Sequence, residues 1–394
     1  MRRPFEPGPR PRGLEPWLGE VPDSLFDDRV YAVCELADRY ATETALDLAR
    51  ALGIEAPLAR GGTVDELLAA CGLAPSFRPA LERLLDRLAG AGEIEREDGS
   101  PPRYRAAGPL PPGEVAELRT LGLEFAPELA ATLDLFDAAA RAYPAAARGE
   151  AAGEELLLAP ASVELWLRYF SNENPVYALS NRIAALAAAH RLPAAGPLRI
   201  LEVGAGAGSA ALALLEELER AGRLADVALY DVTEPSPFFR RRAERALRAR
   251  FPGLALRSRA LDLDSPFENQ GGAQGYDLVF GVNVVHVARD LGASLARLRE
   301  ALVPGGALVA GECFRLFPGQ AVPADLVFQL FRAFTEVRVD GVFRPHHGFL
   351  SPEAWRTAFA AAGFAEVAVV PDLERIRERY ARFFAGAICG RRTA

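Results

Sequence analysis

The sequence of 394 residues contains no lysine, so all 45 of its basic residues are arginine. Because aspartate and glutamate number 53, the net charge is −8, which disfavours general nucleic-acid binding, a function that needs a basic surface. Cysteine and histidine are scarce, with four residues of each. The cysteines form no CxxC pair, which argues against a structural zinc site or a disulfide framework and indicates a reducing cytoplasm.

Long apolar runs are absent as well. Although 50% of the residues are hydrophobic, no stretch of about eighteen uncharged apolar residues occurs, so we predict no membrane span. The first residues are rich in proline, arginine and glycine and lack the apolar core of a secretory signal peptide. We therefore predict that residues 1–27 form a disordered or extended tail. The remaining length is sufficient for two or three domains.

Three helix patterns and a hairpin pattern follow the tail, within residues 28–110. Apolar residues recur at helical spacing from Asp28 to Leu52, and Thr63 and Glu66 have the spacing of a capping box. After a third helix, Glu93–Arg105 reads as a hairpin. This order is typical of a winged-helix domain. Because the charges on its third helix are mixed in sign, we predict a homodimerisation domain in preference to a DNA-binding one.

Two further regions complete the predicted organisation. Residues 111–190 are helical and rich in alanine and leucine, with a predicted loop at Pro144–Gly153, and we interpret them as a connector that covers the active site. Tyr169, near the end of this connector, is a candidate substrate contact. In residues 191–394, apolar strands alternate with helices, which predicts an α/β domain with a Rossmann-type parallel sheet and helices on both faces.

The most informative segment is a glycine-rich loop between a predicted strand and a predicted helix. Gly204, Gly206 and Gly208 follow the apolar run that ends at Val203, and glycines there permit close approach of the backbone to a ligand. The GxGxG spacing differs from the GxGxxG of dinucleotide sites and lacks the Gly-Lys of a phosphate-binding loop. Glu202 before the loop would repel a phosphate and suits a cationic ligand such as one with an ammonium group.

Acidic residues also stand at the ends of the next two predicted strands. Glu234 is placed to accept hydrogen bonds from ribose hydroxyl groups, with Asp231, inside the strand, as its rival. Asp262 is placed to accept from an adenine amino group, and Leu263 to pack on the adenine ring. The alternative for both acids is a solvated loop position.

From Leu198 to about Phe364 the chain resembles the C-methyltransferase domains of polyketide synthases, which use S-adenosylmethionine. The matching stretches include Ile200–Gly206, Leu261–Gly271, Tyr276–Leu291, Leu302–Glu312 and Gly348–Trp355. The N-terminal part departs from those embedded domains and resembles the dimerisation domain of small-molecule O-methyltransferases. The resemblance implies cofactor binding by the glycine loop, Glu234, Asp262, Leu263 and Asn283.

The same resemblance implies a catalytic base. A histidine after the fourth strand, here His286, is oriented in those enzymes by a glutamate that ends the fifth, here Glu312. A positioned imidazole can take a proton from a carbon between two carbonyl groups, and the glutamate would stabilise the imidazolium. The alternatives are that His286 caps a loop and that Glu312 pairs with an arginine. His346 or His347 would contact substrate or, with His286, a metal, although we predict no metal site.

These observations predict an S-adenosylmethionine-dependent C-methyltransferase of secondary metabolism that acts on a β-keto acyl group. Its substrate would be a small molecule or an acyl group on a carrier protein, with no nucleic-acid or membrane partner. A helix face with Arg240, Arg241, Arg242, Arg245 and Arg248 would dock an acidic carrier protein or simply be solvated. The alternatives are O-methylation of a phenol or enol, and a non-catalytic dimeric regulator with a degenerate methyltransferase fold.

Overall fold

A computed structural model describes residues 25, 28–317 and 319–393. The chain folds into two compact units. The sheet unit contains Phe170–Phe314 and the chain from Val337 onward, together with residues 28–31, and the helical unit contains Ala32–Tyr169 and Arg315–Glu336. Helix α2 (Asp28–Ala51) starts in the first unit and continues in the second. The three-part domain organisation derived from the sequence stays a prediction.

The sheet unit is built on seven strands in the order β6-β5-β4-β7-β8-β10-β9. The five strands from β6 to β8 are parallel to their neighbours, whereas β10 is antiparallel to both β8 and β9. The bounds are β4 (Leu198–Glu202), β5 (Val227–Thr233), β6 (Leu256–Arg259), β7 (Tyr276–Val282), β8 (Leu302–Cys313), β9 (Phe364–Val370) and β10 (Ala385–Arg392). The predicted α/β class with a Rossmann-type sheet is confirmed.

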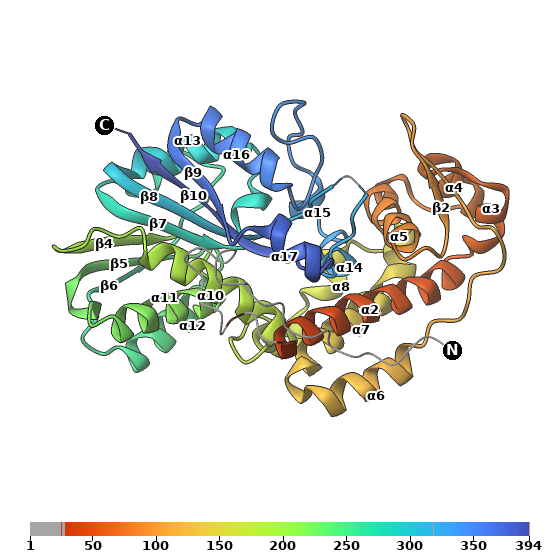
Figure 1. The fold of residues 1–394 in the computed structure, drawn as a ribbon, viewed down its shortest axis with the longest axis horizontal. Coiled ribbons are helices and arrows are strands. Elements are labelled where there is room, and N and C mark those ends of the chain that lie inside the picture. Colours follow the sequence, from red (N-terminus) through yellow and green to blue (C-terminus); the bar gives the residue numbers. More distant parts are fainter. Residues whose placement is uncertain (1–24, 26–27, 318, 394) are drawn as a thin grey trace. The chain divides into compact units, whose positions relative to one another are not determined.

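Helices cover both faces of this sheet (Figure 1). Helices α10 (Pro175–Ala189), α11 (Ser209–Arg220) and α12 (Pro237–Arg250) lie on one face, and α13 (Leu291–Ala301) and α16 (Pro352–Ala361) lie on the other. A short helix, α17 (Leu373–Arg379), precedes β10. The central strands read as nearly continuous apolar runs because both of their faces are buried, as at Ile200, Leu278 and Leu308.

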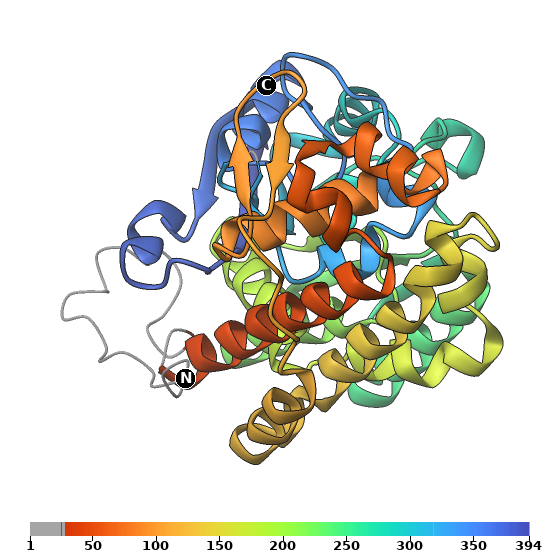
Figure 2. The same cartoon turned by 90° about the vertical axis from the view of Figure 1, so that its right-hand side faces the viewer.

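The helical unit begins with the remainder of α2 and four short elements. They are α3 (Glu55–Arg60), α4 (Val64–Cys71), α5 (Arg78–Gly90) and a three-stranded antiparallel sheet of β1 (Gly62–Thr63), β2 (Glu95–Glu97) and β3 (Arg103–Arg105). The hairpin of β2 and β3 stands out in Figure 2. The predicted capping box is present, since Thr63 accepts from the amide of Glu66 and the Glu66 carboxylate accepts from the amide of Thr63.

The rest of the helical unit contains α6 (Val115–Phe125), α7 (Ala130–Ala147), α8 (Gly153–Leu157), α9 (Val163–Tyr169), α14 (Asp325–Phe328) and α15 (Arg332–Thr335). The predicted loop at Pro144–Gly153 is partly wrong, because α7 continues through Pro144 to Ala147. After β8 the chain enters this unit, where the buried guanidinium of Arg315 pairs with the buried carboxylate of Asp325 at 2.8 Å. Both residues belong to the segment Arg315–Glu336, whose helix α14 packs against α5 and α7.

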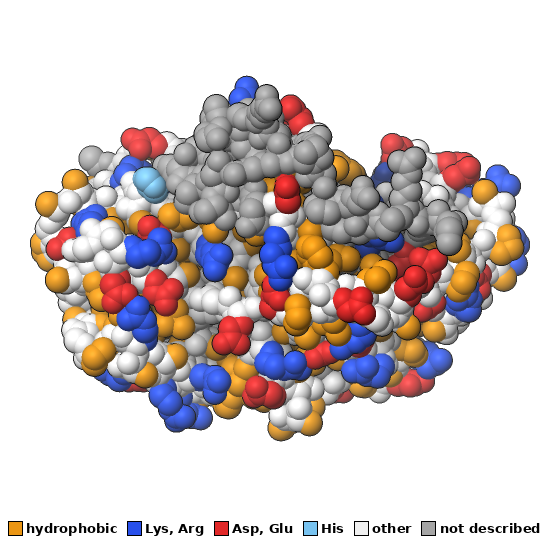
Figure 3. Space-filling view, turned by 60° about the horizontal axis from the view of Figure 1, so that its bottom comes forward, with side chains coloured by type: hydrophobic (Ala, Val, Ile, Leu, Met, Phe, Trp, Pro, Cys, Tyr) orange, Lys and Arg blue, Asp and Glu red, His pale blue; other side chains and the backbone are white. Residues whose placement is uncertain are grey.

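Exposed charge is mixed in sign over much of the surface. On the face drawn in Figure 3, arginine and acidic side chains are interspersed. Many of them form short-range pairs, such as Arg248 with Glu244 at 3.0 Å and Arg168 with Asp134 at 3.0 Å. Among the described residues, no helix is long and apolar enough to span a bilayer.

Candidate active site

Most of the site residues predicted from the sequence meet at one edge of the sheet. Strands β4, β5, β7 and β8 run parallel and side by side, so their carboxyl ends lie at the same edge. In open α/β sheets this edge is where ligands bind. The residues at or just after these strand ends are Glu202, Gly204, Gly206, Gly208, Glu234, Asn283, His286 and Glu312.

The glycine loop connects β4 to α11, and its three glycines all have positive φ angles, of 61°, 53° and 92°. A side chain at Gly204 would collide with Val284, since an added Cβ would lie 2.2 Å from a methyl carbon of that valine. At Gly208 the Cβ would lie 3.1 Å from the backbone of Ala243. At Gly206 the Cβ would meet no atom of the described residues within 4 Å. The loop is therefore closed by protein on two sides and open at Gly206.

Glu234, which follows β5, is tied to this loop. One carboxylate oxygen accepts from the amide of Gly206 at 3.0 Å, and the other accepts from the amide of Ser236 at 2.9 Å. Burial raises the pKa of Glu234, against the lowering effect of these two amides. Its rival Asp231 is fully buried and bonded to Arg257, Arg259 and Tyr276. Of the two acids, Glu234 is therefore the one in contact with the loop.

Glu202, at the end of β4, has no exposed surface and accepts a hydrogen bond of 2.9 Å from the hydroxyl of Tyr230. Burial raises the pKa of Glu202 to about 8, although this hydrogen bond and the Ala211 amide lower it. The acid therefore holds its proton at neutral pH in the ligand-free protein. Its predicted contact with a cationic group of the ligand stays a prediction.

This burial of Glu202 predicts a pH-dependent stability. Between the ordinary pKa of 4.5 and about 8, the folded protein keeps a proton that the unfolded chain releases, so the free energy of unfolding falls as pH rises. Glu202→Gln is neutral at every pH and should remove this loss. Thermal melts should give a gain in Tm over wild type that is smallest near pH 4.5 and increases up to about pH 8. Glu216→Gln, at a half-buried residue of α11, is the control, and an equal profile for both variants would contradict the assignment.

Asp262 and Leu263 lie in a loop after β6. The Asp262 carboxylate is exposed and accepts from the amide of Asp264 and the hydroxyl of Ser265. Gln270 bonds both the amide and the carbonyl of Asp262. The carbonyl of Leu263 accepts from Ser294 and Arg297 of α13. These bonds hold the loop in one conformation, while the contacts predicted for the adenine ring remain predictions.

His286 and Glu312 form a hydrogen-bonded pair. His286 lies in a 3-10 turn (Val285–Val287) after β7, and its Nδ1 is 2.5 Å from Oε2 of Glu312 on β8. The other oxygen of Glu312 accepts from the amides of Val285 and His286 at 3.0 and 3.3 Å. Glu312 is fully buried and His286 is 4% exposed. Of the two alternatives for Glu312, the structure thus shows contact with the histidine and its turn.

Two other residues of the sheet unit are relevant to this site. The ring of Phe349 lies 4.9 Å from the imidazole ring between centroids. Asn283, directly after β7, has a φ of 53°, which is uncommon for a residue other than glycine. Its backbone amide donates to the carbonyl of Gly311 at 2.7 Å. Strained backbone of this kind is concentrated at functional sites.

Arg344, which the sequence did not single out as a site residue, contacts the turn that carries His286. Its guanidinium has no exposed surface and donates to the carbonyl oxygens of His286 and Ala288. Burial lowers the pKa of Arg344 to about 10, against the raising effect of Asp264, Glu312 and other acids. Glu312 therefore accepts hydrogen bonds from the amides of this turn, and Arg344 donates hydrogen bonds to its carbonyl oxygens.

We expect Arg344→Met to lower kcat while leaving the affinity for S-adenosylhomocysteine nearly unchanged. The substitution leaves two buried carbonyls without donors, at about 1–3 kcal/mol each, and releases the turn that carries His286. Arg344→Lys keeps a cationic donor and should recover part of the lost kcat. Steady-state kinetics and calorimetry measure the two quantities. A parallel loss of kcat and affinity in both variants would mean that Arg344 serves only the fold.

Three residues were predicted to contact the substrate: Tyr169, His346 and His347. His346 and His347 are half-buried in the sheet unit, and Nδ1 of His346 lies 3.0 Å from the carbonyl of His347. Tyr169 belongs to the helical unit, where it packs against Trp166 and Phe328. In the described part of the chain, no three metal-binding side chains gather. The roles of these three residues stay predictions.

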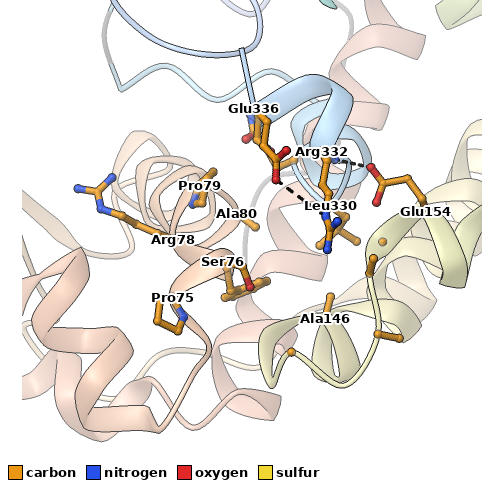
Figure 4. Close-up of a pocket in the computed structure, with 17 residues that line it drawn as sticks. Pro75, Ser76, Arg78, Pro79, Ala80, Ala146, Glu154, Leu330, Arg332 and Glu336 are labelled. Atoms are coloured by element: carbon orange, nitrogen blue, oxygen red, sulfur yellow. Dashed lines mark hydrogen bonds and ion pairs between the residues drawn. The ribbon is translucent and has the colours of Figure 1, made fainter. Parts of the chain in front are cut away.

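A cavity of about 410 Å³ lies within the helical unit, between the start of α5, the end of α7 and the segment Gln329–Glu336 (Figure 4). Its wall includes Arg332, which interacts with Glu154 through its backbone amide and with Glu336 through its side chain. None of the predicted site residues lines this cavity. It is therefore separate from the residues at the sheet edge.

Residues 201–308 match the family model of a methyltransferase domain. The matched stretch contains the glycine loop and extends through His286 to β8. The chain is thus a methyltransferase with S-adenosylmethionine as its cofactor, as the sequence predicts.

Individual relatives agree with this class. The reducing polyketide synthase Preu2 of Preussia isomera is 28% identical over 258 residues, which are 64% of this chain and 10% of the synthase. The chain spans a tenth or less of the length of the first curated relatives it matches. Two carbon methyltransferases share the fold: CurJ, with a TM-score of 0.78 and 22% identity over 97% of both chains, and DszA, with 0.72 and 23% over 98% of this chain and 97% of DszA.

The resemblance to C-methyltransferase domains of polyketide synthases is therefore confirmed. The likeness in fold to CurJ and DszA extends over nearly the whole chain. The winged-helix form of the N-terminal region and the choice between a carbon and an oxygen acceptor stay predictions.

Proposed function

We propose that this chain transfers a methyl group to the α-carbon of a β-keto acyl group in secondary metabolism. The observation that carries the proposal is the buried pair of His286 and Glu312 at the sheet edge that also holds the glycine loop. The curated relatives include polyketide synthases such as Preu2 and lcsB, which supports a substrate of polyketide biosynthesis. An acyl group held on a carrier protein is the form of substrate that we propose.

The residues at the edge fit the cofactor. The opening at Gly206 admits a ligand against the backbone, and Glu234 and Asp262 offer carboxylate acceptors after neighbouring strands. When bound, S-adenosylmethionine supplies an electrophilic methyl group. All other steps are assigned to residues of this chain.

His286 is the proposed base. Because Glu312 accepts at Nδ1, that nitrogen carries the hydrogen of the neutral ring and Nε2 is the atom that takes the substrate proton. A carbon between two carbonyl groups is acidic enough for an imidazole to deprotonate. Glu312 holds the ring in this tautomer and stabilises the imidazolium that forms. The resulting enolate carbon is the nucleophile for the methyl group.

Methyl transfer from cofactor labelled with ¹³C in its methyl group tests the reaction type. The acceptors are acetoacetyl thioesters, as the N-acetylcysteamine ester and on a carrier protein, and a simple phenol. NMR of the products distinguishes a methyl group on carbon from one on oxygen. We expect C-methylated acetoacetyl product, whereas O-methylation or the absence of any labelled acceptor would contradict the proposal.

Homodimerisation through residues 28–110 stays a separate prediction, which the mass in light scattering would test.

A further inference from the structure

The outward face of helix α12 combines positive charge with an exposed aromatic ring. Phe238, Arg241, Arg242 and Arg245 are spaced i, i+3, i+4 and i+7, so they share one side of the helix. All four are exposed, and the Phe238 side chain is 42% exposed. The opposite side of α12 is buried through Ala243 and Leu247. We refer to the four exposed residues as the α12 face.

The arginines of this face differ from the other arginines of α12. Arg240 donates to the carbonyl of Glu234, Arg248 pairs with Glu244, and Arg250 pairs with Glu219. In the part of the chain that the structure describes, Arg241, Arg242 and Arg245 have no acidic partner. Like charges three and four residues apart destabilise a helix by a few tenths of a kcal/mol, so helix stability does not account for them.

The combination is characteristic of a protein-binding surface. Arginine and aromatic residues are enriched in interfaces and frequent among the residues that dominate binding energy. Three arginines are too few for sequence-independent binding of nucleic acid, which typically uses about 6–10 phosphate contacts, and the chain as a whole carries a net charge of −8. The face therefore fits an acidic protein surface with an apolar residue.

The position of α12 relates this face to the proposed reaction. The helix begins at Pro237, three residues after Glu234, which bonds the glycine loop. Phe238, Arg241 and Arg242 are on its N-terminal half, and this end of α12 follows the carboxyl end of β5. A protein bound there would lie beside the edge that carries His286.

We propose that the α12 face docks an acidic carrier protein that presents the acyl thioester to the sheet edge. This inference rests on the proposed function, whose substrate is a β-keto acyl group. Complementary charges would speed the encounter and orient the carrier, while the contact with Phe238 would supply buried apolar area.

The test compares two substrates that carry the same acyl group. One is acetoacetyl on a purified acyl carrier protein of net negative charge, and the other is the small N-acetylcysteamine thioester. For R241E/R242E/R245E we expect kcat/KM with the carrier substrate to fall on the order of tenfold or more, since three contacts become repulsive. With the small thioester, kcat/KM should equal that of wild type.

The control is R220E/R356E/R375E, which makes the same change in net charge at exposed arginines of α11, α16 and α17. It should leave both substrates unaffected. A second variant, Phe238→Ala, should lower kcat/KM for the carrier substrate without changing its dependence on salt. In wild type, that rate constant should fall as salt rises, and in the triple variant it should not.

Each remaining outcome overturns the inference. An unchanged rate with the carrier substrate, or an equal loss with both substrates, excludes docking at the α12 face. Binding of a short DNA duplex that disappears in the triple variant, with carrier kinetics unaffected, would assign the face to nucleic acid. If wild type methylates neither thioester, the proposed function itself has failed, which the docking variants alone would not show.

Discussion

His286→Ala should lower turnover by roughly 10²–10⁴-fold, the usual contribution of a positioned general base, with little change in affinity for S-adenosylhomocysteine. The imidazole is nearly buried and touches Glu312 rather than the glycine loop. Its removal should therefore affect the proton transfer and leave the cofactor contacts in place. Labelled-methyl transfer and calorimetry measure the two effects separately.

Two further variants serve as comparisons for His286→Ala. Glu312→Gln keeps an acceptor for Nδ1 and loses the charge, so we expect a smaller loss of turnover than for His286→Ala. His190→Ala removes an exposed histidine beyond the end of α10 and should have no effect. If His286→Ala retained full activity, the base would have to be sought elsewhere, with His346 and His347 as the next candidates.

Gly206→Val should abolish binding of S-adenosylhomocysteine in a protein that remains folded. The Cβ of any larger residue at this position extends into open space beside the loop, where we place the ligand. Since an added Cβ meets no atom of the described residues within 4 Å, we expect the valine side chain to clash with the ligand and not with the protein. Calorimetry gives the affinity, and circular dichroism gives the folded state.

Gly222→Val is the matched control, because Gly222 has a φ of 69° and its Cβ would also meet no described atom within 4 Å. Both substitutions carry the strain of a left-handed residue, about 1–2 kcal/mol. Only the one in the loop should remove binding. Equal affinities in the two variants would show that the pocket has been misplaced.

Local signals made much of the sheet unit predictable. The helix predicted after the glycine loop is present as α11 (Ser209–Arg220), because glycines precede it and its apolar residues keep helical spacing. His286 and Glu312 were predicted through the resemblance to C-methyltransferase domains, which implies a histidine after the fourth strand and a glutamate at the end of the fifth. Parallel strands bring such ends together, even though the two residues are 26 positions apart.

Other features leave little trace in the sequence. Arg344 acts on backbone carbonyls, and every residue has a carbonyl, so no residue pattern reveals the contact. The stretch Pro144–Gly153 suggested a loop because its residues are small and polar, but α7 continues through Pro144 to Ala147. The segment Arg315–Glu336 returns to the helical unit through the packing of α14 on α5 and α7, and contacts between elements so far apart in the chain leave no local pattern in the sequence.

Exchange of the α-proton of acetoacetyl thioester with deuterated water, without any methyl donor, tests the central claim most directly. It isolates the proton transfer to His286 from methyl transfer and from product release. The uncatalysed exchange is subtracted with a sample that lacks enzyme. Wild type should accelerate the exchange at the α-carbon, and His286→Ala should not exceed the background. Equal acceleration by both proteins, or none by wild type, would contradict the assignment of His286 as the base that prepares the carbon for methylation.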